Sequence, residues 1–332
     1  MTLLQVRNLT VEYQTAAGTY RAVEDLSFHL EQGKALGIVG ESGCGKTTAM
    51  LALMRLLPEE GRIVDGEIQF EQTDLLGLSP DKLNQYRWRM ISMIFQGAMN
   101  ALNPVRTVGG QIEEAIRLHG TVARSEVKNE VLRLLDLVGI VFSRVGHYPH
   151  QYSGGMRQRA MIAMALACRP RIVIADEPTT ALDVMVQAQI LDLLERLQKE
   201  LDLSIILVTH DLGLVAELCD DVLVMYGGRM AEYASSHRIY NHAGHPYTQR
   251  LLSAFPDIEN PGAELASIPG YPPALDALPP GCRFQPRCHL ALDICALEPP
   301  PNVEVIPDHL VSCVRAQPEQ ARVEGEDGRL LA

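Results

Sequence analysis

Gly40-Glu41-Ser42-Gly43-Cys44-Gly45-Lys46-Thr47 is the stretch of this sequence that decides its fold. It matches the pattern G-x-x-x-x-G-K-[ST], in which backbone N–H groups and a lysine hold phosphate groups. An apolar run over residues 35–39 comes directly before it, and an amphipathic stretch extends from residue 46 to 57. A strand, a glycine-rich loop and a helix in this order are the context that the match requires. The sequence therefore predicts a phosphate-binding loop within an α/β protein.

The residue types in this loop suit nucleotide phosphates. Gly40, Gly43 and Gly45 allow the backbone to approach closely, and the N-terminus of the following helix attracts anions. Lys46 supplies a positive charge to the β- and γ-phosphates, and Thr47 supplies a hydroxyl to Mg²⁺. The expected nucleotide-binding segment also includes four neighbouring residues, namely Glu41, Ser42, Cys44 and Thr48.

A second glycine pair occurs in Ser153-Gly154-Gly155-Met156. It combines a hydroxyl, close backbone approach and a helix N-terminus, so it predicts a second anion site. Shortly afterwards an apolar strand over residues 172–175 ends at Asp176 and Glu177. Two acids at a strand end are common by themselves, but next to a phosphate-binding loop one can bind Mg²⁺ and the other can polarise a water molecule.

Strands and helices alternate in the second half of the chain. Apolar runs at 172–175, 204–208 and 222–225 are separated by helical patterns at 184–201 and 212–218. Such alternation predicts a mainly parallel sheet with helices on both faces. Residues 4–13 and 22–30 read as further strands, and the apolar spacing becomes helical between residues 107 and 139.

The loop 40–47, the segment 153–155 and the strand that ends at Asp176 and Glu177 together resemble the nucleotide-binding subunits of ATP-binding-cassette (ABC) systems. The resemblance implies an α/β fold of the P-loop ABC type, with a mainly parallel core, an antiparallel β part and a helical subdomain. It covers residues 1–240, with the helical subdomain at about residues 97–168. It implies ATP and Mg²⁺, with each nucleotide clasped between the loop of one subunit and Ser153, Gly154, Gly155 and Met156 of another. Met156 stands where the family usually has glutamine.

The same resemblance implies roles for individual residues. Glu177 matches the catalytic carboxylate, His210 the switch histidine after strand 204–208, and Gln96 the glutamine after strand 91–95. Thr47, Gln96 and Asp176 are the expected Mg²⁺ ligands. Asp183 lies in the segment that contacts the opposite subunit in the family.

Adenine requires an aromatic surface on which to stack. Tyr13 lies at the end of the first predicted strand, where the family places its stacking residue. Tyr20 is an alternative, because the intervening loop can bring it near.

Prolines and cysteines crowd the region after residue 241 and indicate an irregular extension over residues 241–332 with a frayed tail. Cys282, Cys288, Cys295 and Cys313 could supply four thiolates to zinc or to an iron–sulfur cluster. The paired C-x-x-C spacing of zinc ribbons is absent, which weakens the zinc alternative.

The extension also resembles the C-terminal domain of oligopeptide and dipeptide transporter ATPases. The resemblance rests on the segments 245–248, 268–273 and 282–288. In some members of that family such cysteines ligate a [4Fe–4S] cluster. We therefore expect a [4Fe–4S] cluster here, with Zn²⁺ or unoccupied thiols as the alternatives.

Composition limits the partners. The chain has 332 residues, is 47% hydrophobic and carries a net charge of −12, which argues against nucleic acid as a partner. It has no apolar run of roughly 18 residues, and its start lacks the features of a signal peptide. A membrane role must then come through other chains.

The resemblance implies an ATPase subunit that powers import, of dipeptides or oligopeptides, by closing and reopening an ATPase dimer. Its expected partners are a second ATPase, typically a different chain, two integral-membrane permeases and an extracytoplasmic substrate-binding protein. The expected location is the cytoplasmic face of the membrane. Nickel chelates, opines or oligosaccharides are alternative cargoes, and a soluble ABC ATPase outside transport, or an iron–sulfur redox sensor that binds ATP, is an alternative function.

Overall fold

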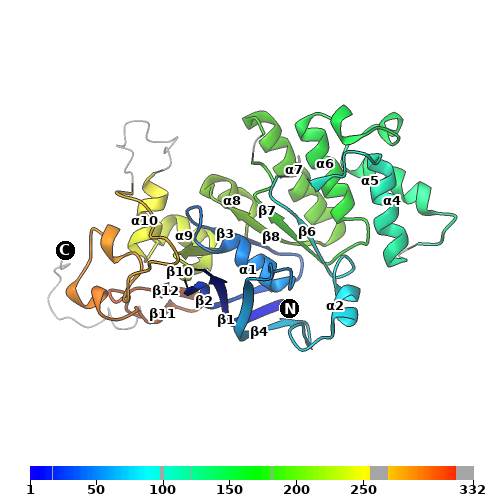
Figure 1. The fold of residues 1–332 in the computed structure, drawn as a ribbon. Coiled ribbons are helices and arrows are strands. Elements are labelled where there is room, and N and C mark those ends of the chain that lie inside the picture. The colour runs from blue at the N-terminus through cyan, green and yellow to red at the C-terminus, as the bar shows by residue number, and fades with distance from the viewer. Residues whose placement is uncertain (17, 98–100, 121, 181, 255–267, 319–332) are drawn as a thin grey trace.

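Two β-sheets form the framework of the protein. The computed structural model describes all residues except 17, 98–100, 121, 181, 255–267 and 319–332 (Figure 1). The smaller sheet is antiparallel, with the strand order β2-β1-β4-β5. Its strands are β1 (Thr2–Thr15), β2 (Gly18–Glu31), β4 (Gly61–Phe70) and β5 (Thr73–Asp74).

The larger sheet has the strand order β11-β12-β10-β9-β3-β8-β7-β6. Pairing is parallel from β9 through β3, β8 and β7 to β6, and antiparallel from β9 to β11. The parallel part therefore carries the carboxyl ends of its strands on one edge. The strands are β3 (Ala35–Val39), β6 (Ile91–Ile94), β7 (Ile172–Asp176), β8 (Ser204–Thr209), β9 (Asp221–Tyr226), β10 (Arg229–Ser235), β11 (Asn302–Ile306) and β12 (His309–Ser312).

Helices flank this sheet at one end and cover it near the middle. Figure 1 shows α4 and α5 at one end of the molecule, β11 and β12 towards the other, and β3 with α1 between them. The α-helices are α1 (Lys46–Leu53), α2 (Pro80–Tyr86), α4 (Val108–His119), α5 (Val127–Leu137), α6 (Gly154–Ala165), α7 (Val184–Leu201), α8 (Leu212–Leu218), α9 (Ser236–His242) and α10 (Pro246–Ser253). Short 3-10 turns are η1 (Phe142–Arg144), η2 (Pro149–Gln151), η3 (Gln285–Arg287) and η4 (Asp293–Ala296).

Alternating side chains of the central strands divide the interior into two hydrophobic clusters. In β3, Ala35 and Val39 belong to the cluster beneath the helical part, whereas Leu36 and Ile38 belong to the cluster against the antiparallel sheet. Every residue of β3 is buried, as expected for a strand with both faces covered. The predicted parallel core, antiparallel part and helical part are thus confirmed.

The C-terminal extension adds a hairpin to the larger sheet. Strand β12 pairs with β10 and β11 pairs with β12, so the hairpin lies at one end of the sheet and β11 is its edge strand. The proline content argued against central strands in this region, and the edge position is the one in which missing backbone donors are tolerated. Within the described part of the chain, no helix is both long enough and apolar enough to cross a membrane.

Candidate functional site

The predicted phosphate-binding loop connects β3 to α1. Gly40 has φ 151° and Gly45 has φ 97°, which side chains rarely allow. A Cβ atom on Gly40 would lie 2.2 Å from the carbonyl oxygen of Met225, and one on Gly45 would lie 2.4 Å from that of Ala22. Both obstacles are backbone atoms, so no side-chain movement could make room. These two glycines therefore allow the loop to pass directly beside β9 and β2.

Lys46 lies at the start of α1 with its ammonium group inside the loop. Its Nζ donates to the carbonyl oxygens of Gly40 at 2.6 Å and Glu41 at 3.1 Å, and the residue is 5% exposed. Cys44 lies beside it, and burial raises the pKa of this thiol, which keeps it uncharged. Phosphate oxygens bind an ammonium more strongly than neutral carbonyls do, so Lys46 can exchange these partners for phosphate.

Thr47 and Asp176 bring a hydroxyl and a carboxylate together. Thr47 Oγ1 donates to Asp176 Oδ1 at 3.2 Å, across from the first turn of α1 to the end of β7. Asp176 is 1% exposed, and burial raises its pKa, with a further contribution from the charge of Glu177. A cation beside this carboxylate would favour its ionised form. Oxygen ligands of these types are those that Mg²⁺ prefers, so the residues fit a magnesium site.

Glu177 is the centre of a polar cluster. Gln96 Nε2 donates to Glu177 Oε2 at 2.7 Å, and Thr180 Oγ1 donates to the same oxygen at 2.9 Å. His210 Nδ1 lies 3.7 Å from Glu177 Oε1. The structure thus brings together the three residues predicted to be catalytic, from the ends of β6, β7 and β8. Thr180 is a partner that the sequence analysis did not single out.

The Ser153 segment forms the start of α6. Ser153 Oγ accepts a hydrogen bond from the Met156 N–H at 3.3 Å, which makes Ser153 the helix N-cap. A Cβ atom on Gly155 would lie 2.7 Å from Val186 Cγ1, so Gly155 allows α6 to approach α7 closely. Figure 1 shows α6 grouped with α5 and α7, while α1 lies among the strands. The segment and the loop 40–48 are therefore distinct parts of the protein surface.

Asp183 begins the helix that Gly155 approaches. Its Oδ1 accepts a hydrogen bond from the Val186 N–H at 3.0 Å, so it caps α7.

Tyr13 and Tyr20 lie face to face. They are directly opposite each other in the pairing of β1 and β2, and their ring centroids are 5.8 Å apart at 17°. Both rings are half-buried. The structure therefore places the two candidate stacking residues in one aromatic surface instead of separating them.

The prediction of an iron–sulfur cluster is wrong. Among the residues that the structure describes, no group of three or more histidine, cysteine, aspartate or glutamate side chains is arranged to hold a metal ion. Cys282, Cys288, Cys295 and Cys313 do line one small cavity of about 20 Å³, and all four are free cysteines. The same finding corrects the prediction that the extension binds a metal, including the alternative of zinc.

The surroundings of these cysteines are those of packed, uncharged thiols. Burial raises the pKa of Cys282, Cys288 and Cys313, which favours their neutral thiol form. The Cys282 N–H donates to the carbonyl oxygen of Cys295 at 2.7 Å, which joins two segments of the extension. The cysteines therefore pack the interior of a segment that has little regular structure.

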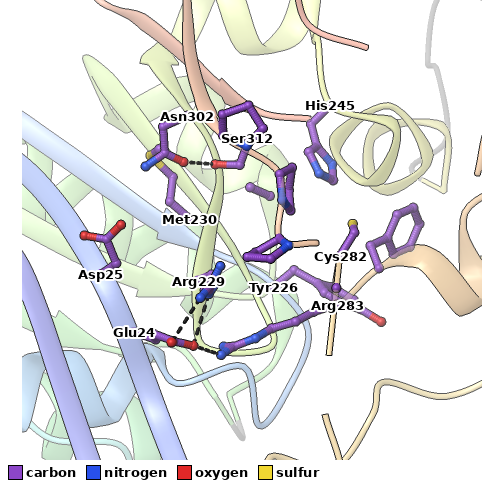
Figure 2. Close-up of a pocket in the computed structure, with 16 residues that line it drawn as sticks. Glu24, Asp25, Tyr226, Arg229, Met230, His245, Cys282, Arg283, Asn302 and Ser312 are labelled. Carbon is purple, nitrogen blue, oxygen red and sulfur yellow. Dashed lines mark hydrogen bonds and ion pairs between the residues drawn. The ribbon is translucent and has the colours of Figure 1, made fainter. Parts of the chain in front are cut away.

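A larger cavity of about 310 Å³ lies between the extension and the first strands (Figure 2). Figure 2 shows Arg229 and Arg283 converging on Glu24 at its edge. Burial opposes ionisation of Glu24, but hydrogen bonds from Arg229 and Arg21 and the charge of Arg283 outweigh it and lower its pKa to about 2. Arg283 belongs to the extension, so this ion pair fastens the extension to β2.

Neither Arg283 nor Glu24 stands in a sequence pattern that predicts this ion pair. The only signal for Arg283 was its place in the segment 282–288, which served there as a mark of resemblance. The partners lie 259 residues apart, a separation across which no local pattern operates.

Comparison with protein families gives two matches. A family model described as "ABC transporter" matches residues 23–180, and one described as "Oligopeptide/dipeptide transporter, C-terminal region" matches residues 231–295.

Individual proteins agree with these matches. The chain is 50% identical to the oligopeptide transport ATP-binding protein OppD of Salmonella typhimurium over 300 residues, which cover 90% of this chain and 89% of that protein. It is 48% identical to the dipeptide transport ATP-binding protein DppD of Bacillus subtilis, over 94% of each chain. Among solved structures, it is similar to a dimeric post-hydrolysis state of the ATP-binding cassette MJ0796 bound to ADP and Pi. That similarity has a TM-score of 0.63 and 27% identity, and covers 70% of this chain and 98% of the other.

Proposed function

Because the chain belongs to the family of ATP-binding subunits of oligopeptide and dipeptide ABC transporters and is an ATPase, we propose which of its residues bind and hydrolyse ATP and what it helps to import. The observation that carries the proposal is the convergence of the loop 40–48, Thr47 with Asp176, and Glu177 with Gln96 and His210 at one sheet edge. Binding, metal and hydrolytic groups are thereby adjacent.

The loop residues hold the phosphates. Backbone N–H groups of residues 40–48 and the N-terminus of α1 bind phosphate oxygens, and Lys46 turns from its own loop carbonyls to the β- and γ-phosphates. The adenine stacks on the surface of Tyr13 and Tyr20, with Tyr13 as the contacting ring. Mg²⁺ would neutralise charge on the phosphates, and Thr47, Asp176 and Gln96 would hold it.

Glu177 orients and polarises the attacking water. Gln96 and Thr180 fix one of its oxygens, which leaves the oxygen nearer His210 for the water. His210 is well exposed, so it can reach the γ-phosphate and stabilise the charge that develops there.

A second ATPase completes the site. The start of α6, with Ser153, Gly154, Gly155 and Met156, presents its hydroxyl and N-terminus to a nucleotide on the partner subunit, and Asp183 lies at the contact. Binding must favour the closed pair by about 5.5 kcal/mol to move the population from about 1:99 to about 99:1. Hydrolysis removes this preference and the pair reopens.

The rest of the assembly follows from the family. We place the nucleotide-binding domain at residues 1–240, its helical subdomain at about 97–168 and the extension at 241–332. Two permeases, a substrate-binding protein and a second, different ATPase are the proposed partners, with the chain on the cytoplasmic face of the membrane. The proposed cargo is dipeptides and longer peptides.

Uptake by the assembled transporter tests the proposal. Lys46→Ala should abolish ATP-dependent uptake of labelled peptides into vesicles that contain the permeases, because the phosphates lose their charge partner. Lys199→Ala is the matched control, since Lys199 is an exposed residue of α7 and, among the residues that the structure describes, its ion pair is with Glu195 alone. Native uptake with Lys46→Ala would reject the ATP site. Uptake of a nickel chelate, an opine or an oligosaccharide in place of peptides would reject the cargo.

A further inference from the structure

An arginine of the C-terminal extension contacts the phosphate-binding loop directly. Arg287 Nη1 donates to Glu41 Oε2 at 2.6 Å, and Nη2 donates to Glu41 Oε1 at 3.0 Å. Glu41 is the second residue of the loop, whereas Arg287 ends η3, 246 residues later. The two parallel hydrogen bonds form the bidentate arrangement that is the strongest arginine–carboxylate contact.

Several further hydrogen bonds hold the side chain of Arg287 in place. Its Nε donates to the carbonyl oxygen of Pro269 at 2.8 Å, Nη1 also donates to the Tyr226 hydroxyl at 3.2 Å, and Nη2 donates to the carbonyl oxygen of Gly270 at 3.3 Å. Its side chain is only 6% exposed. Burial opposes its charge, but hydrogen bonds with Glu41 and Tyr226 outweigh this and raise the pKa of Arg287. The guanidinium is therefore a fixed cation beside the loop.

The extension also holds the loop backbone. The Glu41 N–H donates to the hydroxyl of Tyr247, a fully buried residue of α10, at 3.0 Å. At the other end of the loop, the Gly228 N–H donates to the carbonyl oxygen of Cys44 at 2.9 Å. Gly228 belongs to the β9–β10 turn, and Arg283 donates to the neighbouring Gly227 carbonyl. Both halves of the loop are thus connected to residues after 241.

The charge of Glu41 makes this contact important for ATP. Lys46 donates to the backbone carbonyls of Gly40 and Glu41, so the carboxylate of Glu41 lies on the same part of the loop as the phosphate-binding ammonium. Without a partner, this carboxylate would repel the negatively charged phosphates and weaken the site. Arg287 supplies that partner.

We propose that Arg287 is a positioning residue for ATP, which neutralises Glu41 and, with Tyr247, fixes the first residues of the phosphate-binding loop. The C-terminal extension is then a part of the nucleotide site and not only an appendage of the domain. The inference rests on the proposed role of residues 40–48 in binding ATP.

Equilibrium binding of Mg-ATP and Mg-ADP to the full chain tests the proposal. Arg287→Met should raise the Kd for Mg-ATP about tenfold or more, and the Kd for Mg-ADP by a smaller factor, because ADP carries less negative charge. Glu41→Gln alone should stay within about threefold of native. The double variant Glu41→Gln with Arg287→Met should return to within about threefold of native, since it has no unpaired carboxylate. Arg287→Lys should recover part of the loss.

Two comparisons separate this role from a general loss of folding. Arg315→Met is the matched control, because within the described part of the chain Arg315 donates to the carbonyl oxygen of Leu290 alone, and the ATP affinity of this variant should be native. In the assembled transporter, Arg287→Met should raise the KM for ATP and leave kcat within about threefold.

The following outcomes would overturn the inference about Arg287 or the proposed function. Native ATP affinity in Arg287→Met, or a double variant as weak as Arg287→Met, overturns the inference. If Arg287→Met does not fold, Arg287→Lys decides, because lysine cannot make the two parallel hydrogen bonds: a native Kd for Mg-ATP in Arg287→Lys overturns the inference. If the native chain binds no ATP, or binds it equally after Lys46→Ala, the proposed function fails instead.

Discussion

Glu177 stands in a backbone conformation that few residues with side chains adopt. Its φ is 45°, and its N–H donates to the carbonyl oxygen of Val208 at 2.8 Å. Such a conformation costs about 1–3 kcal/mol, so the surrounding structure must hold it. Here β8 holds the backbone while Gln96 and Thr180 hold the carboxylate. This arrangement leaves the other carboxylate oxygen, Oε1, without a hydrogen bond from Gln96 or Thr180 and nearer to His210.

Glu177→Gln should bind ATP normally and lose turnover. The amide has nearly the same shape but is a much weaker base, so ATPase activity should fall by about 100-fold or more. Phosphate release measures the loss, and size-exclusion chromatography with ATP should show an accumulated pair of subunits.

Glu200→Gln is the matched control for this change. Glu200 lies in α7, is half-exposed and has Arg196 as its one ion-pair partner among the described residues, so the ATPase rate of this variant should be native. A normal rate in Glu177→Gln would remove this residue from the role of base.

Asp183 caps helix α7 and also lies at the proposed contact between subunits. Asp183 caps it by accepting from the Val186 N–H, and Asp202 at the other end adopts a left-handed conformation with φ 51°. The buried residues Ile190, Leu194 and Leu197 face the hydrophobic cluster beneath the helical part. The cap therefore fixes the end of the helix next to the proposed subunit contact.

Asp183→Ala should destabilise the protein by about 1 kcal/mol, because the first turn of α7 loses its side-chain acceptor. Urea unfolding monitored by circular dichroism measures the change in the free energy of unfolding.

Asp183→Asn should keep most of the stability, since the amide oxygen can accept the same hydrogen bond. Equal stability of the alanine and native proteins would show that the hydrogen bond to Val186 contributes nothing.

At the scale of the whole molecule, the extension is built into the ATPase core. Glu232 of β10 is fully buried and accepts hydrogen bonds from the Gly244 N–H at 2.7 Å, the His245 N–H at 3.1 Å and His309 Nε2 at 2.7 Å. His309 belongs to β12. One buried carboxylate thus joins β10, the start of α10 and the C-terminal hairpin.

Acid should weaken this connection through His245. Burial lowers the pKa of His245 to about 4, from an ordinary value of 6.5, although the charge of Glu232 acts in the opposite direction. Between these values the unfolded chain binds a proton that the folded protein does not, so stability falls as pH drops from about 6.5 to about 4. The free energy of unfolding in urea, measured at intervals across this range, gives the dependence.

His245→Asn is the comparison that isolates this group. Asparagine can still accept the hydrogen bond that His245 Nδ1 receives from the Tyr247 N–H at 3.0 Å, but it does not titrate. Its stability should depend less on pH over the same range. Identical slopes in the two proteins would exclude His245 as the cause.

Local chemistry made most of the nucleotide site predictable. The residues around Lys46, Asp176 and Glu177 each lie at the end of an apolar run, and parallel strands bring such ends to one edge. The cysteines show the opposite case, because spacing alone cannot reveal whether thiols are charged or how their sulfur atoms are disposed. Tyr13 and Tyr20 are similar, since only the register of β1 and β2 places them face to face.

The sequence by itself determined the α/β fold and the family, and it predicted the phosphate-binding loop, because these depend on the order of residue types over short stretches. Only the tertiary structure decided that Arg287 reaches Glu41, that Glu232 joins three distant segments, and that the four cysteines form no metal site. The physical reason is that long-range ion pairs and burial depend on which distant segments the fold brings together, as it does when the last two strands of the sequence, β11 and β12, join the sheet beside β10.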